Sequence, residues 1–155
     1  MTPLMLQDDL VEEIKNLFSE QLFAAPGKRQ VHINVFPQNL PIADSDDDED
    51  PIPYIIVRLG KGKDAGTGDS NHTVKVYIII GLFDDSPDAQ GHRGLLNIIC
   101  KIYDRFQTNP CLANKYVYAG VFEWEIQEDG YYPLFFGVVE MDFNIPAIRR
   151  EDRFT

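Results

Sequence analysis

Cysteine, basic residues and long apolar runs are all scarce in this sequence, and each shortage excludes a class of protein. The two cysteines are Cys100, within an apolar helical pattern, and Cys111, which follows Pro110, so we predict free thiols and neither a disulfide framework nor a CxxC site. No apolar run approaches the roughly 20 residues that cross a bilayer. Met1–Leu10 lacks the basic start and apolar core of a signal peptide. We therefore expect a protein that folds in a cytoplasm and has no membrane partner.

Basic residues are outnumbered, with 14 Lys and Arg against 25 Asp and Glu, which gives a net charge of −11. Binding to DNA or to an anionic membrane draws its free energy from clustered Lys and Arg. The composition therefore argues against a protein that wraps DNA. A basic partner, repulsion of DNA and plain solubility remain as interpretations of the charge.

Apolar residues make up 44% of the 155 residues and aromatic residues 12%, which is enough to bury a core of its own. We find no internal repeat and no second domain boundary, so residues 1–155 are predicted to form a single domain. Three segments are expected to be exposed: an acidic mobile loop at 37–53, a glycine-rich hairpin loop at 60–71 and a charged tail at 147–155.

Apolar periodicity predicts two helices and about five strands. The first helix lies within residues 4–24 and ends at Ala24-Ala25-Pro26-Gly27, and the second begins near Pro87 or Asp88 and ends at Asn109-Pro110. Strands are predicted at 30–36, 54–59, 72–83, 116–126 and 133–145, with 72–83 central in the sheet. The fold class is therefore α+β, with two helices packed on an antiparallel-rich or mixed sheet.

An acidic run lies in the first exposed segment and consists of Asp44, Asp46, Asp47, Asp48, Glu49 and Asp50. Its alternating carboxylates resemble a calcium-binding loop. However, Glu49 stands where such a loop needs glycine, and Ile55 stands where it needs a bidentate Glu. We interpret the run as a solvated loop that could dock on a basic partner surface, and we predict no metal site.

The glycine-rich segment at 60–71 carries Lys61 and Lys63, the main local concentration of positive charge. It lacks the GxxxxGK[ST] spacing and is not followed by a helix, so it does not predict a nucleotide site. We interpret it as a hairpin tip that could dock on an acidic patch of a neighbouring subunit.

No residues are predicted to be catalytic or to bind a cofactor. The histidines fit neither an HExxH nor a GxSxG motif; they are His32, His72 and His92. Glu123 and Glu125 project from the face opposite Trp124 and are interpreted as a solvated strand edge. Trp124 is expected to be part of the core or of an interface.

Four segments together resemble the tail terminator and head-tail joining proteins of long-tailed bacteriophages: PIPYIIVRLG at 51–60, HTVKVYIIIGLFDD at 72–85, GHRGLLNIICKIYDRF at 91–106 and LFFGVVEMDFNIPAIRRED at 134–152. The resemblance implies two helices on a mixed or antiparallel sheet and a six-membered homo-oligomeric ring. This ring would stop growth of the tail tube and bind the head connector, while DNA passes without specific binding. The protein would then be found in the host cytoplasm during assembly and afterwards in the virion.

If this resemblance holds, the exposed segments supply the contacts between subunits or with the tail tube protein and head connector protein. These are the loops at 38–53 and 60–71 and the tail after Ile145, which contains Arg149 and Arg150.

Two alternatives come from other classes. An acidic DNA mimic or other inhibitory binding protein would present the carboxylates of 44–50 to a DNA-binding enzyme. A small hydrolase would have a pocket with perturbed carboxylates or histidines.

Overall fold

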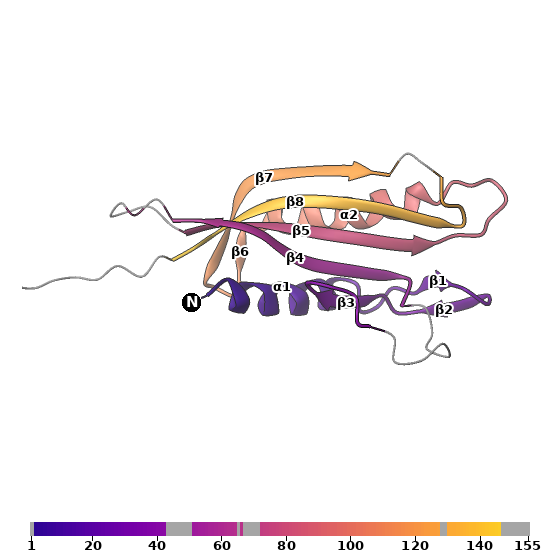
Figure 1. The fold of residues 1–155 in the computed structure, drawn as a ribbon, viewed down its shortest axis with the longest axis horizontal. Helices are drawn as coiled ribbons and strands as arrows, with labels where there is room; N and C mark the ends of the chain where they lie inside the picture. Colours follow the sequence, from indigo (N-terminus) through magenta and orange to yellow (C-terminus); the bar gives the residue numbers. More distant parts are fainter. Residues whose placement is uncertain (1, 43–50, 65, 67–71, 128–129, 147–155) are drawn as a thin grey trace, which may run out of the picture.

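The computed structural model describes residues 2–42, 51–64, 66, 72–127 and 130–146 (Figure 1). Within these ranges the chain forms two helices and eight strands. In order they are α1 (Pro3–Leu17), β1 (Phe23–Ala25), β2 (Arg29–Val31), β3 (Asn34–Pro37), β4 (Tyr54–Lys63), β5 (His72–Phe83), α2 (His92–Thr108), β6 (Cys111–Leu112), β7 (Tyr116–Ile126) and β8 (Leu134–Ile145).

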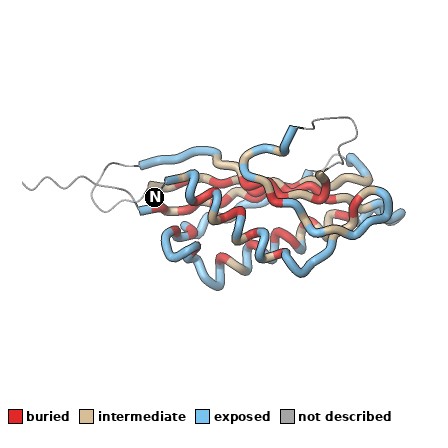
Figure 2. The backbone as a smooth tube through the Cα atoms, turned by 90° about the horizontal axis from the view of Figure 1, so that it is seen from below, coloured by how far each residue is buried: buried red, intermediate tan, exposed pale blue. Residues whose placement is uncertain are grey.

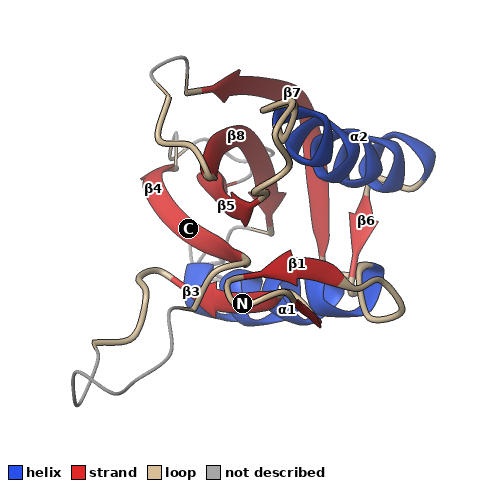
Figure 3. Ribbon diagram, turned by 90° about the vertical axis from the view of Figure 1, so that its right-hand side faces the viewer, coloured by secondary structure: helices blue, strands red, loops and turns tan. Residues whose placement is uncertain are grey.

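Six of these strands form one curled sheet in the order β3-β4-β5-β8-β7-β6, and β1 and β2 form a separate two-stranded hairpin (Figure 3). Every neighbouring pair in the large sheet is antiparallel except β3 and β4, which are parallel. The predicted α+β class and the mostly antiparallel, mixed sheet are confirmed. The expected number of strands was too low, because the short strands β1, β2 and β6 were not anticipated.

Both helices pack on one face of the sheet because strand side chains alternate between its two faces. On β5 the buried apolar side chains belong to every second residue from Val74 to Leu82, and the matching positions on β8 run from Val139 to Ile145. Long strands β4, β5, β8 and β7 run side by side along the length of the molecule (Figure 1). The prediction that residues 72–83 form a central strand is therefore confirmed.

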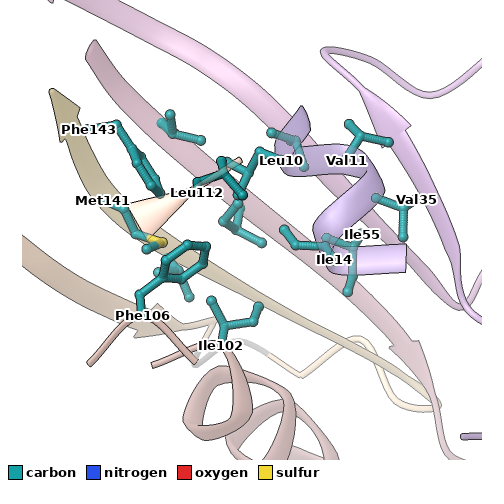
Figure 4. Packing of buried hydrophobic residues seen from close by; sticks show 14 of the residues in the cluster. Leu10, Val11, Ile14, Val35, Ile55, Ile102, Phe106, Leu112, Met141 and Phe143 are labelled. Carbon is teal, nitrogen blue, oxygen red and sulfur yellow. The ribbon is translucent and has the colours of Figure 1, made fainter. Parts of the chain in front are cut away.

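The core lies between this face and the two helices. Side chains from α1, such as Leu10 and Ile14, meet Ile102 and Phe106 of α2 and Phe143 of β8 in one cluster (Figure 4). Figure 2 shows the buried positions gathered along the strands and on the inner side of each helix. Each fully buried residue of this size contributes about 1.5–3 kcal/mol of apolar transfer free energy.

The first helix is shorter than predicted, since α1 ends at Leu17 rather than near Ala24. Backbone geometry leaves the helical region at Phe18, and the hydroxyl of Ser19 donates a hydrogen bond of 3.0 Å to the carbonyl of Asn16. Pro26 and Gly27, which were predicted to end this helix, instead form the turn of the β1–β2 hairpin, where Gly27 has a φ of 81°.

The strand predicted at 30–36 is divided between two sheets. Its first residues pair with β1 as β2, and its last residues pair with β4 as β3. The second helix begins later than predicted, at His92. Asp84 and Asp88 each accept a hydrogen bond from the backbone N–H two residues further on, so the intervening chain forms turns and not helix.

Gln38 anchors the start of the segment that was predicted to be a mobile loop. Its side-chain Oε1 accepts the Leu59 N–H at 3.0 Å, and its Nε2 donates to the Leu59 carbonyl at 3.4 Å. Buried Gln7 of α1 donates to Gln38 Oε1 at 3.0 Å and to the Val57 carbonyl at 2.8 Å. Gln38 lies in the bend that follows β3, and its side chain extends the pairing of β3 with β4. Residues 43–50 lie outside the described part of the chain.

Replacing Gln38 with alanine should lower the free energy of unfolding by about 1–3 kcal/mol, because the amide of Leu59 and the side chain of Gln7 lose partners away from water. Chemical denaturation followed by circular dichroism measures this. Gln21→Ala, at an exposed position before β1, is the matched control and should change the value by less than about 0.5 kcal/mol. Equal effects of the two substitutions would contradict the role of Gln38.

Candidate interaction surface

Two stretches of strand have an open edge in the described part of the chain. β6 pairs with β7 only at Tyr116 and Val117. Residues 122–126 of β7 therefore pair with β8 on one side and with no strand on the other, and residues 119–121 form an irregularity in the pairing with β8. At the opposite edge of the sheet, β3 pairs with β4 only as far as Val57, and Gln38 occupies the backbone of Leu59. The last residues of β4, 60–63, have β5 on one side alone. Open edges offer unpaired N–H and C=O groups to another strand.

Exposed apolar side chains gather at the β7 edge. Trp124 is 53% exposed and Val121 39%, although Trp124 lies opposite the fully buried Val139 of β8. On α2, Tyr103 is 43% exposed and packs edge-on against Phe122, with 5.0 Å between ring centroids. The interpretation of Trp124 as a core residue is therefore wrong, because α2 covers Phe122 and leaves Trp124 largely open to solvent. Its predicted role in an interface stays a prediction.

The sheet face away from the helices combines apolar residues with carboxylates. Ile79, Phe136 and Val138 line a shallow depression bordered by Glu125 and Gln127. All three apolar residues are half-buried, and no helix of the described residues packs on this face.

Lys75 neutralises part of the acidic charge on this outer face. Its Nζ lies 2.7 Å from a carboxylate oxygen of Glu140 and 3.6 Å from one of Asp142. The hydrogen bond to Glu140, and the charges of both carboxylates, raise the pKa of Lys75 above its usual value. Glu123 stands directly opposite Glu140, on β7, and it has no ion-pair partner among the described residues; the same holds for Glu125.

Of the predicted contact residues, the structure describes Lys61 and Lys63. Both are exposed, but they lie in β4 and not at a loop tip, because β4 continues through Gly60 and Gly62 with a bulge between Leu59 and Gly62. The remaining candidates lie outside the described residues; they are Asp44, Asp46, Asp47, Asp48, Glu49, Asp50, Arg149 and Arg150. So do residues 67–71 of the predicted hairpin loop and the tail at 147–155.

The histidines and cysteines are scattered over the described residues, and one of them, His72, lies beside the free end of β4. His32 is in the bend between β2 and β3, His72 covers Gly62, and His92 begins α2. Cys100 and Cys111 are free and exposed. Across the ranges that the structure describes, no three side chains of His, Cys, Asp or Glu form a group that could hold a metal ion. Neither helix in these ranges is long and apolar enough to span a bilayer.

Sequence reasoning identified Glu123, Glu125 and Trp124 but missed Val121 and Tyr103 as exposed members of the same surface. No sequence signal marks these two residues, because the open edge arises from the lengths of the strands: β6 is only Cys111–Leu112, whereas β7 is Tyr116–Ile126. A strand much longer than its neighbour must leave an edge unpaired.

Comparison with known proteins does not place this chain in a family. No family model matches the sequence, and no curated protein matches it.

Proposed function

We propose that the protein is a structural assembly protein of a long-tailed bacteriophage, which forms a homo-oligomeric ring that terminates the tail tube and joins it to the head connector. The resemblance of four sequence segments to that class supports the proposal, and so does a fold with two helices on one face of a mostly antiparallel sheet. The observation that carries it is the open β7 edge with its exposed aromatic and aliphatic side chains.

An assembly protein acts by binding other protein chains through its surface. A strand edge and exposed aromatic side chains gain free energy when another strand covers them, since hydrogen bonds and apolar burial then add together. Long strands that run the length of the molecule give such an edge a fixed direction (Figure 1). The net charge of −11 suits a ring whose bore lets DNA pass without adhesion.

An inhibitor that mimics DNA is the alternative. Mimicry needs unpaired carboxylates spread over the folded surface, and on the outer sheet face Lys75 pairs with two of them, Glu140 and Asp142. This favours the assembly role, and the alternative remains as an outcome of the test below.

The test is light scattering of the purified protein across concentration, with negative-stain imaging in the absence and presence of tail tubes. We expect rings, six-membered as the resemblance implies, that seat on the open end of a tube and stop its growth. A protein that stays monomeric at every concentration and never binds tubes would contradict the proposal. Tight, salt-sensitive binding to a basic nuclease instead would favour the DNA mimic.

Trp124→Ala gives a second test of the same surface. Because Trp124 is 53% exposed, its loss should change the free energy of unfolding of the isolated subunit by less than about 1 kcal/mol. Ring formation should require at least about ten-fold more protein, since aromatic residues dominate interface energetics. Leu22→Ala, also 53% exposed but before β1, is the matched control and should leave assembly unchanged. If the Trp124→Ala subunit unfolds, or if it forms rings at the wild-type concentration, Trp124 is not part of an interface.

A further inference from the structure

We infer that neighbouring subunits join head to tail by strand pairing, in which the β7 edge of one copy, residues 122–126, pairs with the free end of β4, residues 60–63, of the next copy. This inference rests on the proposed ring and names the contact that closes it. It is carried by three independent features of the described residues: two open edges, their directions and their charges.

The two edges belong to opposite sides of one sheet. β7 is the last long strand on one side and β4 the last on the other, in the order β4-β5-β8-β7. Figure 3 shows β7 and β4 separated by β5 and β8, and no helix lies at the arrowhead of β7. A contact between different edges of two copies is heterologous, and such contacts generate rings when the rotation closes.

The strand directions suit this pairing. Three antiparallel steps separate β4 from β7, so the two strands run in opposite directions within one subunit. A rotation that keeps the strand direction brings β7 of one copy beside β4 of the next with that opposition kept. For the two free edges to meet, β4 is also displaced along β7 by the four residues that separate Thr73, level with Lys63, from Tyr77, level with Glu123. The new pair is therefore antiparallel, as are the long strand pairs within the subunit, and antiparallel ladders are slightly the more stable kind.

The charges are complementary. Glu123 and Glu125 lie on the outer face of β7, opposite Glu140 and Val138 of β8. Lys63 lies on the same outer face of β4, opposite Thr73 of β5. A continuous sheet keeps outer residues on one side, so Lys63 of one copy meets the carboxylate of Glu123 of the next at this displacement. A lysine beside Glu123 would also relieve its repulsion with Glu140.

The same charges argue against a symmetric contact. A two-fold axis through the β7 edge would set Glu123 and Glu125 of one copy against the same residues of the other, and a two-fold axis through β4 would do the same with Lys61 and Lys63. Like charges across a strand pair are destabilising. Only the heterologous pairing brings opposite charges together.

The proposed pairing between β7 and β4 is short, so each contact between subunits should be weak. Residues 60–63 of β4 can form only a few inter-strand hydrogen bonds, each worth about 1 kcal/mol net. Two isolated subunits should therefore associate weakly, and stable assembly should need ring closure or a tail tube that holds the subunits together.

Charge reversal tests the contact. The double variants Glu123→Lys/Glu125→Lys and Lys61→Glu/Lys63→Glu should each raise the protein concentration needed for ring formation by at least about ten-fold. Combining all four substitutions should restore assembly, because the pairs are then reversed together. Glu12→Lys/Glu20→Lys, which changes the charge equally at exposed sites of α1 and the turn after it, is the control and should assemble normally. The two lysines and the two glutamates at the contact are all exposed, and circular dichroism verifies that each variant folds.

A zero-length carbodiimide cross-link identifies the partner edge directly. In rings assembled from an equal mixture of isotopically light and heavy protein, mixed-mass links should join Lys61 or Lys63 to Glu123 or Glu125. Rings that form normally in both double variants and lack these links would overturn the inference while leaving the proposed ring intact. A wild-type chain that forms no ring, alone or on tubes, would overturn both.

Discussion

Phe106→Ala should lower the free energy of unfolding by about 3–5 kcal/mol, the range for truncating a fully buried phenylalanine. Phe106 is 1% exposed and its ring packs edge-on against Phe143, with 5.3 Å between centroids. A second aromatic residue, Tyr118 of β7, lies 6.1 Å away. The substitution therefore opens a cavity where α2, β7 and β8 meet, and these rings cannot collapse into it without leaving their own strands.

The measurement is urea denaturation followed by tryptophan fluorescence and circular dichroism. Tyr103→Ala on the same helix is the matched control, because Tyr103 is 43% exposed and should cost less than about 1 kcal/mol beyond its contact with Phe122. Phe106→Leu should fall between the two. A loss below about 1 kcal/mol for Phe106→Ala would show that α2 is not anchored in the core as described.

The core was the most predictable part of this fold. Apolar residues of α2 recur at helical spacing, and the structure buries five of that stripe and leaves Tyr103 exposed; the five are Leu95, Ile98, Ile99, Ile102 and Phe106. On β5 and β8 the alternation of apolar residues matches the buried face. A buried face imposes one period on its sequence, so the pattern alone places these elements against each other.

Element ends were less predictable, because they depend on partners distant in sequence. β4 continues through Gly60 and Gly62, whose composition indicates a loop, because pairing with β5 continues to Lys63. The sequence around Gln38 indicates only a loop. The parallel pairing of β3 and β4 brings Leu59 beside Gln38, and the N–H and C=O of Leu59 both bond to the Gln38 side chain. Tertiary context overrides local propensity in both places.

The candidate surface was predictable only in its composition. Alternation places Phe122 and Trp124 on the same face of β7, and no sequence signal separates them. The difference arises from Tyr103 of α2, which packs against Phe122 while Trp124 remains half exposed. The open edge likewise follows from the shortness of β6, which is set by where the chain turns after α2.

Arg105→Met should lower the free energy of unfolding by about 2–3 kcal/mol, because one guanidinium group joins three parts of the chain. Its Nε donates a hydrogen bond to the carboxylate of Glu13 on α1. Its other two nitrogens donate to the carbonyl of Asn109 at 2.5 Å and to the carbonyl of Cys111 at 3.1 Å. The guanidinium carbon also lies 4.8 Å from the ring centroid of Phe106. Methionine keeps most of the side-chain volume and removes all of these donors.

The loss should fall on the packing of α1 against the end of α2 and not on the sheet. Arg93→Met is the matched control, since Arg93 is exposed near the start of the same helix and should cost less than about 0.5 kcal/mol. Arg105→Lys should give an intermediate loss, because an ammonium keeps the charge but not the planar fork that reaches three acceptors at once. Amide hydrogen exchange should show faster exchange in α1 and around Cys111, with β5 and β8 unchanged. Uniform loss of protection throughout the sheet, or a loss no greater than that of the Arg93 variant, would contradict the role of Arg105 in holding the two helices together.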